Sequence, residues 1–286
     1  MQLRTDLALE QREMHTDLPE GVTCTEQTER DMTVTRIGIL NDVGAKALGK
    51  PVGNYITIEV PPFSDHPEQE AQVQAVAREL AALLPKAGSV LIAGLGNRGI
   101  TPDALGPKAA ARILPTRKIG AEIARVAGIK EIRSVSVITP GVLGQTGVEA
   151  ADLIAGVADK ISPAAVIVID ALASRYVKRL GATVQLSDAG IEPGAGVGNA
   201  RQEISRQTMG VPVIAMGVPT VVDAATLVAD LTGGRGELAE PCGRQMIVTP
   251  REIDLLIDRA AGLLAAAINR ALHPALDAAL ITELWA

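Results

Sequence analysis

The sequence has almost no aromatic residues: Phe, Trp and Tyr together make up 1% of its 286 residues. Aliphatic side chains must therefore fill the core, and such a core suits parallel strands that helices cover on both faces. The lack of aromatics also removes the stacking platform that single-stranded nucleic acids require. The formal net charge of −6 adds no electrostatic attraction for nucleic acid, so we expect no direct contact with it.

Long hydrophobic runs and cysteines are scarce as well. The longest apolar runs, at residues 89–95 and 164–169, are far shorter than the roughly 20 residues of a membrane helix. The N-terminus has no apolar signal region, which predicts a soluble protein of the cytoplasm without membrane contact. Cys24 and Cys242 are too far apart for a metal-type spacing and are expected to be buried small side chains or surface thiols.

Short β-branched runs alternate with helix-like stretches. Strands are predicted at residues 33–40, 55–60, 89–95, 133–138, 165–169, 183–186 and 212–218, and helices at 68–84, 102–113, 119–127, 147–161, 223–231 and 251–272. This alternation is typical of βαβ crossovers in an α/β fold with a mainly parallel central sheet flanked by helices. The first two strands alternate polar with apolar residues, which favours an antiparallel pair.

One α/β domain is predicted over residues 31–286. The first 30 residues are charged and poorly periodic, which favours a surface arm. Residues 233–245 are rich in glycine and are predicted to form a loop before the last helices.

Two aspartates are the main candidates for chemistry. In an open parallel sheet, ligands bind beyond the carboxyl ends of the strands. Asp103 follows the strand predicted at 89–95, and Asp170 ends the buried run at 165–169. Each also has a purely structural interpretation, because Asp103 suits a first helical turn and Asp170 suits a helix N-cap. Together at one sheet edge, they can share a proton or a divalent metal and polarise a water molecule.

Two glycine-rich segments are candidates for ligand binding. Gly94, Gly96 and Gly99 form a G-x-G-x-x-G pattern after a strand, which is compatible with a nucleotide site, but Pro102 starts the helix only after the glycines. A sharp turn explains the pattern better. The second segment, residues 188–201, has too many glycines for a helix or strand; it suits close approach of a substrate backbone, or else a mobile connector. Asp188 and Asp223 are weaker candidates that suit turn or helix caps.

Other catalytic schemes find little support. No histidine follows a core strand, so surface positions are predicted for His15, His66 and His273. The serine-nucleophile motif G-x-S-x-G and the zinc-protease motif H-E-x-x-H are both absent from the sequence, and neither cysteine has a plausible histidine partner. Any metal would therefore be held mainly by carboxylates and carbonyls.

Eight ordered motifs resemble the germination protease family of spore-forming bacteria. They are Arg4-Thr-Asp-Leu-Ala, Leu48-Gly-Lys-Pro-Val-Gly-Asn-Tyr-Ile-Thr, Gly94-Leu-Gly-Asn, Thr101-Pro-Asp-Ala-Leu-Gly-Pro, Pro140-Gly-Val-Leu-Gly-Gln-Thr-Gly, Ile169-Asp-Ala-Leu-Ala, Pro193-Gly-Ala-Gly-Val-Gly-Asn and Gly217-Val-Pro-Thr-Val-Val-Asp. The resemblance covers residues 4 to about 230 and resumes near residues 248–254.

The resemblance implies an endopeptidase, made as a zymogen, that degrades the small acid-soluble proteins coating spore DNA during germination. It also implies a homotetramer, a location in the spore core or forespore, and a fold similar to hydrogenase maturation proteases and phosphorylase-like proteins. The essential aspartates of the family fall on Asp103 and Asp170, with a metallo- or aspartic-type mechanism left open. Substrate contacts are expected from the glycine loops, at Gly94, Gly96, Asn97, Gly194, Gly196, Gly198 and Asn199.

The family cleaves after an acidic residue that a bulky apolar and then a small residue follow, and Thr5-Asp-Leu-Ala fits this pattern. The resemblance therefore predicts self-cleavage between Asp6 and Leu7, with residues 1–6 as a propeptide. Six residues form a shorter leader than is usual in the family, so control of the zymogen is expected to differ. The stretch at 233–245 is also shorter than in the family. A nucleoside- or nucleotide-binding protein and a catalytically inactive scaffold stay open as alternatives.

Overall fold

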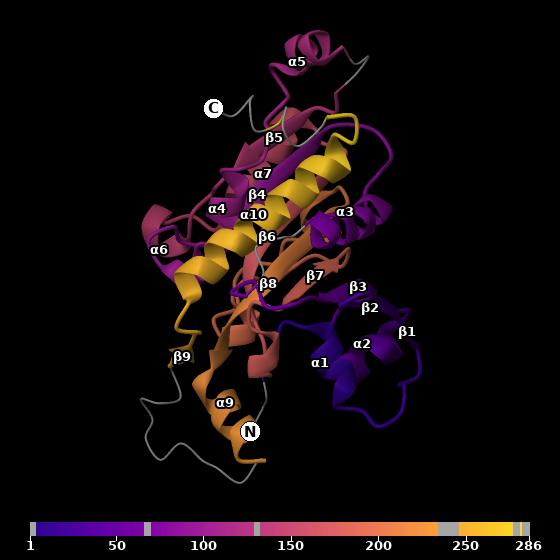
Figure 1. Cartoon of the computed structure of the whole chain (residues 1–286), viewed down its shortest axis with the longest axis vertical. Helices are drawn as coiled ribbons and strands as arrows, with labels where there is room; N and C mark the ends of the chain where they lie inside the picture. Colours follow the sequence, from indigo (N-terminus) through magenta and orange to yellow (C-terminus); the bar gives the residue numbers. More distant parts are fainter. Residues whose placement is uncertain (1–3, 66–69, 129–131, 234–245, 277–280, 282–286) are drawn as a thin grey trace.

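The computed structural model describes residues 4–65, 70–128, 132–233, 246–276 and 281. A large twisted sheet runs through the molecule, with helices on both of its faces (Figure 1). The predicted α/β class is thereby confirmed. Among the described residues, no helix has both the length and the apolar character needed to cross a membrane.

The sheet is mixed, and its two halves differ in strand direction. The strands lie in the order β1-β2-β3-β7-β8-β6-β4-β5, with β9 paired to β8. Pairs among β4, β5, β6 and β8 are parallel, whereas β1, β2, β3 and β7 form antiparallel pairs, including β7 with β8. The bounds are β1 Val22–Glu29, β2 Met32–Ile39, β3 Gly53–Glu59, β4 Val90–Gly94, β5 Val135–Ile138, β6 Ala165–Ala173, β7 Thr183–Ser187, β8 Val213–Asp223 and β9 Ile247–Val248.

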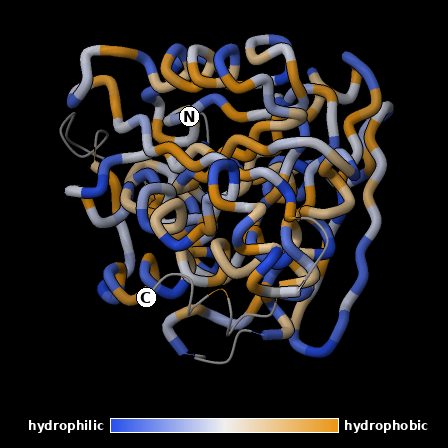
Figure 2. The backbone as a smooth tube through the Cα atoms, turned by 90° about the horizontal axis from the view of Figure 1, so that it is seen from above, coloured by the Kyte–Doolittle hydropathy of each residue, from blue (hydrophilic) through white to orange (hydrophobic). Residues whose placement is uncertain are grey.

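Helices cover both faces of the parallel half. One apolar core joins α3, α4 and α10 to one face of the sheet, and a second joins α7 to the other face. Figure 2 shows hydrophobic residues running through the middle of the molecule, while hydrophilic turns lie mainly at its periphery. The helices are α1 Ala8–Glu13, α2 Asp42–Leu48, α3 Glu70–Leu83, α4 Leu105–Ala110, α5 Gly120–Ala127, α6 Leu143–Thr146, α7 Ala150–Ile161, α8 Arg206–Met209, α9 Ala224–Leu231 and α10 Ile253–Leu272.

The N-terminal region differs most from the prediction. A surface arm is wrong for the described part of residues 1–30, because β1 pairs along its length with β2 and the side chains of Leu7 and Ala8 are fully buried. The apolar residues of α1 pack with β2 and β3 in a small core of their own. The six-residue helix is too short for its periodicity to be read from the sequence. The propeptide limits 1–6 stay a prediction.

The predicted antiparallel pairing of residues 33–40 with 55–60 is confirmed as β2 with β3. The two parallel strands β6 and β8 continue past their predicted ends, through Ala173 and Asp223. Asp170 is therefore not a helix N-cap, because it lies inside β6.

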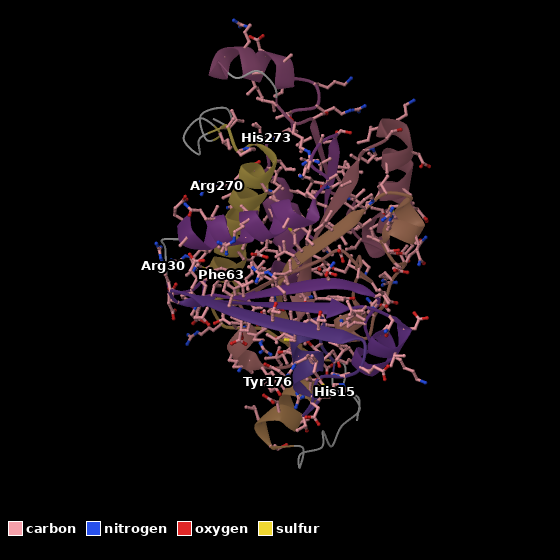
Figure 3. All side chains as sticks on the ribbon, turned by 90° about the vertical axis from the view of Figure 1, so that its right-hand side faces the viewer. His15, Arg30, Phe63, Tyr176, Arg270 and His273 are labelled. Atoms are coloured by element: carbon pink, nitrogen blue, oxygen red, sulfur yellow. The ribbon has the colours of Figure 1, made fainter. Side chains whose placement is uncertain are left out.

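The histidine and loop predictions have mixed outcomes. His273, after the end of α10, is 3% exposed, so its predicted surface position is wrong (Figure 3). Burial and the nearby charge of Arg133 lower its pKa to about 4. His15 is partly buried and contacts the carbonyl of Ala47 through Nε2. Cys24 lies partly buried on β1 as a free thiol. His66, Cys242 and most of the loop at 233–245 lie outside the described residues.

Candidate active site

Asp170 is a buried carboxylic acid within β6. Its side chain is on the sheet face that α7 covers, since Val166 and Val168 on the same strand face belong to that core. Burial raises its pKa well above the ordinary value, and the charges of Asp103 and Asp6 raise it further. The N–H of Ala171 donates to Asp170 Oδ1 at 2.9 Å and opposes the shift only in part. Asp170 is therefore disposed to hold a proton.

Asp103 reaches the same place from the loop after β4. It ends a single 3-10 turn, Thr101–Asp103, just before α4. The N–H of Asn97 donates to Asp103 Oδ2 at 2.7 Å, which closes the loop over the glycines. Burial raises the pKa of Asp103, and the Asn97 N–H counteracts this rise. The two predicted aspartates thus lie within electrostatic reach of each other, although 67 positions separate 103 from 170 in the chain.

A glycine opens the surface next to Asp170. Across the sheet, Asp170 on β6 and Gln185 on β7 are both register partners of Gly217 on β8. Register partners share a face, so the two side chains project on either side of a position that has none. Adjacent strands are about 4.8 Å apart, which leaves roughly 10 Å between the two flanking backbones. This strip of the sheet between Asp170 and Gln185 is the slot, and the Leu172 side chain covers part of it, since a Cβ on Gly217 would lie 2.8 Å from Leu172 Cγ.

The N-terminal segment of the chain itself crosses this slot. The N–H of Asp6 donates to the carbonyl of Ala173 at 2.9 Å, and the N–H of Ala173 donates to Asp6 Oδ2 at 2.8 Å. Two residues later, the N–H of Ala8 donates to Gln185 Oε1 at 2.8 Å. Residues 6–8 therefore pass from β6 to β7 over β8, and the predicted cleavage bond lies in this crossing.

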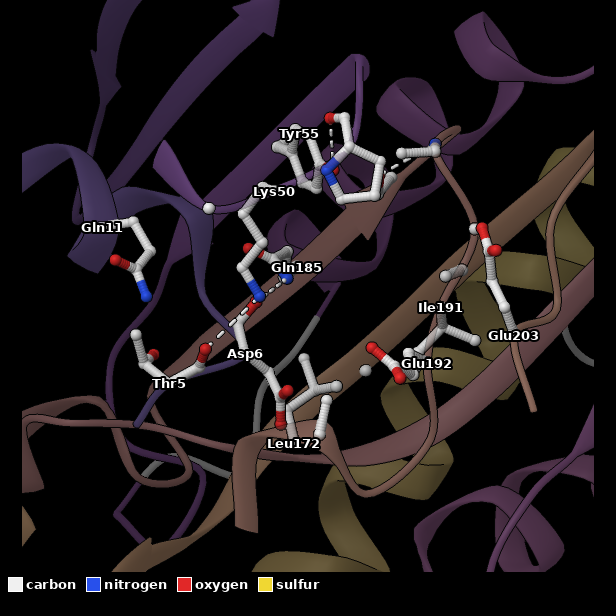
Figure 4. A pocket seen from close by; sticks show the side chains of 18 of the residues that line it. Thr5, Asp6, Gln11, Lys50, Tyr55, Leu172, Gln185, Ile191, Glu192 and Glu203 are labelled. Carbon is white, nitrogen blue, oxygen red and sulfur yellow. Dashed lines mark hydrogen bonds between the residues drawn. The ribbon is translucent and has the colours of Figure 1, made fainter. Parts of the chain in front are cut away.

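The carboxyl group of Asp6 is held among polar groups (Figure 4). Besides Ala173, the backbone of Gly196 hydrogen-bonds to it, and the charge of Lys50 acts on it; all three lower its pKa. Burial outweighs them, and the net pKa of Asp6 is raised. Lys50 donates to the carbonyl of Thr5 at 3.3 Å, and burial lowers the pKa of its ammonium. The Asp6 carboxyl group thus has backbone donors and an ammonium around it, although burial disfavours its ionised form.

A cavity of about 470 Å³ adjoins this segment. Its walls come from the N-terminal segment, the loop around Lys50, β7, β8 and the loop after β7. Glu192 and Glu203 lie across the cavity from Lys50 and Asp6 (Figure 4). The cavity therefore reaches Asp6, whereas Leu7, Asp103 and Asp170 do not line it.

The second glycine loop packs against the N-terminal segment. A Cβ on Gly196 would lie 2.2 Å from Asp6 Oδ2, so glycine permits this close approach. Gly198 lies next to the Arg4 side chain and has a φ of +72°, which favours glycine. Gly194 and Asn199 close the loop through a hydrogen bond from the Asn199 N–H to the Gly194 carbonyl. The substrate-binding role of these residues stays a prediction.

The first glycine loop supports Asp103. Among the described residues, it forms no hydrogen bond with the N-terminal segment. Gly94 packs against the backbone of Gly106 on α4, and Gly96, at a φ of +111°, packs against Asp103. Asn97 binds the Asp103 carboxyl group directly. These residues therefore help to position Asp103, and a substrate contact at Gly94, Gly96 or Asn97 stays a prediction.

The weaker candidates have structural roles. Asp223 caps α9 by accepting from the N–H of Thr226, and Asp188 accepts from the backbone and side-chain amides of Asn54. Lys50 and Gln185 are the residues that sequence reasoning missed. Lys50 lies inside one of the family motifs, but the sequence assigned it no role. Gln185 lies in the predicted strand 183–186, where Thr183 and Gln185 alternate with Val184 and Leu186, and this alternation was the available signal.

A metal bound here would have few protein ligands. Within the described parts of the chain, no three His, Cys, Asp or Glu side chains are grouped as metal ligands. Asp103 and Asp170 supply two carboxylates, which suit a divalent ion whose remaining ligands are carbonyls and waters. The possible metal at these two residues stays a prediction.

Comparison with known proteins agrees with the sequence motifs. A family model described as germination protease matches residues 2–233. Curated germination proteases of Caldanaerobacter subterraneus subsp. tengcongensis, Clostridium tetani and Priestia megaterium are 44%, 40% and 34% identical; the matches cover 96%, 97% and 96% of this chain and 95%, 97% and 95% of theirs.

A solved NiFe hydrogenase maturation protease from Thermococcus kodakarensis also aligns, with a TM-score of 0.37 and 16% identity over 66% of this chain and 98% of that one. The family match and the full-length relatives are decisive. The chain belongs to the germination protease family.

Proposed function

We propose that this protein is an endopeptidase that starts the degradation of small acid-soluble DNA-coating proteins in the germinating spore core. The observation that carries the proposal is the pair Asp103 and Asp170 beside an extended segment that contains an acidic residue. Family membership supports a protease with protein substrates. The preference for an acidic residue is supported by the groups around Asp6.

The two carboxyl groups have different surroundings, which suits different roles. Asp170 is more deeply buried and is acted on by two further carboxylates, so it keeps its proton and serves as the acid. Asp103 is partly exposed and accepts a backbone N–H, so it ionises first and serves as the base. Asp103 takes a proton from water while the water oxygen attacks the peptide carbonyl carbon. Asp170 donates its proton to the departing nitrogen as the C–N bond breaks.

The same site acts on its own chain, between Asp6 and Leu7. The carboxyl group of Asp6 lies among the backbone donors of Ala173 and Gly196 and near the charge of Lys50. The side chain of Leu7 is fully buried, as a bulky apolar residue after the cut would be in a substrate. The protein is thus made as a zymogen, and release of residues 1–6 removes Asp6 from the slot, so that the acidic residue of another substrate can take its place. We further propose a homotetramer as the working form, an arrangement that light scattering on the purified protein tests directly.

The test uses the full chain and a peptide of residues 1–14. Wild-type protein should yield a new N-terminus at Leu7 and should cut the peptide after position 6. Asp103→Asn and Asp170→Asn should each lose both reactions by about 10²–10⁴-fold, the usual contribution of acid–base catalysis. A parallel series with a chelator separates metal-dependent from purely carboxylate chemistry. Cleavage that persists in both variants would contradict the proposal.

A further inference from the structure

The side chain of Gln185 reaches across both ends of residue 7. Gln185 lies in the middle of β7, with its side chain on the face opposite Val184 and Leu186, and only 7% of the residue is exposed. Its Nε2 donates to the carbonyl oxygen of Asp6 at 3.0 Å, and its Oε1 accepts from the N–H of Ala8 at 2.8 Å. One carboxamide therefore holds the chain on both sides of the Asp6–Leu7 bond.

The orientation of this carboxamide is determined by its partners. A backbone N–H only donates and a carbonyl only accepts, so Oε1 must face Ala8 and Nε2 must face Asp6. A flipped amide would place two donors together at one end and two acceptors at the other. The donor consequently points at the carbonyl of residue 6, the group that water attacks in the proposed reaction.

The contact follows a main-chain pattern. In a parallel ladder, one residue binds the carbonyl and the N–H that flank a single residue of its neighbour. Gln185 reproduces this pattern with its side chain, and no part of the contact depends on what side chain stands at position 7. It would hold the backbone of any substrate in the same register as residues 6–8.

We propose that Gln185 is the residue that holds and polarises the carbonyl of the bond to be cut, in this chain and in its substrates. The proposal rests on the proposed function, because it takes Asp6–Leu7 as a cleavable bond. When water attacks, negative charge develops on the carbonyl oxygen, and a donor already directed at that oxygen stabilises it. Asp170 and Gln185 are register partners of Gly217 on its two sides, and the charge of Asp6 acts on Asp170.

Self-cleavage of the full chain gives the most direct test, since it is unimolecular and does not depend on substrate affinity. Removing one such donor typically lowers the rate by about 10²–10³-fold. We expect this loss in Gln185→Ala, measured as the first-order appearance of the Leu7 terminus. A rate within threefold of wild type would overturn the proposal.

Gln185→Glu separates polarisation from simple packing. An ionised glutamate keeps the acceptor for the Ala8 N–H but cannot donate to the carbonyl, so the variant should be slow at pH 7. Below about pH 5 its carboxyl group protonates and regains a donor. The rate relative to wild type should therefore rise as the pH falls. A ratio that is constant with pH would show that Gln185 has only a structural role.

Thr183→Val is the matched control. Thr183 lies two residues before Gln185 on the same face of β7, is fully buried, and its hydroxyl has no hydrogen-bond partner among the described residues. The variant should self-cleave like wild type. If wild type and this control both stay uncut, the proposed self-cleavage fails, and the role of Gln185 fails with it. If both are cut and Gln185→Ala is cut equally fast, only the role of Gln185 fails.

Hydrogen exchange gives a readout apart from activity. The amide of Ala8 is protected by Gln185 Oε1, so its exchange should become faster in Gln185→Ala, while the amides of β7 itself should keep their wild-type rates. Unchanged protection of Ala8 would mean that the side chain does not hold the segment in solution. Faster exchange throughout β7 would instead indicate a folding defect and would remove Gln185→Ala as evidence, leaving the pH response of Gln185→Glu to decide.

Discussion

Asp170 carries its carboxyl group in surroundings that disfavour the ionised form. It is 6% exposed, and the charges of Asp103 and Asp6 act on it. Two carboxylates held close together cannot both ionise easily, so one of them keeps a proton. Such a pair supplies an acid and a base at the same pH, which hydrolysis of a peptide bond requires.

The raised pKa of Asp170 predicts a pH-dependent effect on stability. The folded state keeps the Asp170 proton at pH values where the unfolded chain, with a pKa of about 3.9, has lost it. This contribution to stability is fully present below about pH 4 and is lost as the pH rises through the folded pKa. Asp170→Asn has no charge to bury, so it should melt like wild type near pH 4 and at a higher temperature than wild type at pH 8. A lower melting temperature at pH 8 would contradict this.

Lys50 and Asp6 are expected to act together in recognition. The ammonium of Lys50 lowers the pKa of Asp6, and Asp6 in turn raises that of Lys50. Asp6→Asn should slow self-cleavage in the wild-type background but much less in the Lys50→Met background, because methionine has no charge to pair with Asp6. A double-mutant cycle on the four self-cleavage rates (wild type, the two single variants and the double variant) should give a coupling of about 0.5–3 kcal/mol. Additive effects would mean that Lys50 does not recognise the acid.

At the scale of elements, the close packing of α4 on β4 and β6 positions both aspartates. A Cβ on Gly106, near the start of α4, would lie 2.2 Å from the carbonyl of Leu95 and 2.5 Å from that of Ile169. The second contact is to the residue directly before Asp170. The loop that carries Asp103 spans the short distance between β4 and α4. Glycine at 106 thus permits the helix to bring the two acids together.

Gly106→Ala should therefore destabilise the protein, because backbone atoms cannot move aside as a flexible side chain can. We expect a loss of about 1–3 kcal/mol in the free energy of unfolding, as for other overpacked sites, and slower cleavage. Gly156→Ala is the control: Gly156 is an exposed residue within α7, and a Cβ there meets nothing within 4 Å. Alanine at that position should stabilise the protein by about 0.5–1 kcal/mol. Urea denaturation measures both, and equal effects would contradict the packing argument.

At the scale of the whole molecule, the buried Arg179 joins the N-terminal region to the sheet. Its guanidinium forms ion pairs with Glu10 and Glu13 of α1 and with Glu59 of β3. Glu10 also accepts from the hydroxyl of Thr5 and from the N–H groups of Arg175 and Tyr176. This network fixes α1, which begins at the end of the crossing segment, and through the Thr5 hydroxyl it also fixes the start of that segment.

Arg179→Met should be strongly destabilising, because it leaves Glu10, which is fully buried, without its counter-charge. Removing one partner of a buried ion pair costs about 3–5 kcal/mol. Arg125→Met is the control, since Arg125 pairs with Glu122 on the surface of α5 with 72% of its side chain exposed, and exposed pairs of this kind contribute little to stability. Thermal unfolding followed by circular dichroism compares the two. A similar melting temperature for both variants would contradict a central role for the Arg179 network.

The sequence by itself determined the α/β class, the central strands and the two aspartates as the leading candidates. Continuous apolar runs such as residues 165–169 identify buried strands, because a strand covered on both faces has no polar alternation. The rule that ligands bind at the carboxyl ends of parallel strands then selects the residues after them. Neither step requires knowledge of contacts between distant parts of the chain.

Only the tertiary structure decided what surrounds the aspartates. The mixed character of the sheet depends on β7 pairing antiparallel to β8, and strand direction is not encoded in local hydrophobic patterns. The burial of Ala8 and Leu9 depends on β2 and β3, which lie farther along the chain. Gln185 and Lys50 acquire their roles from contacts with residues 5–8, more than 40 positions away. Such long-range contacts depend on how the whole chain packs, and a local sequence pattern does not contain them.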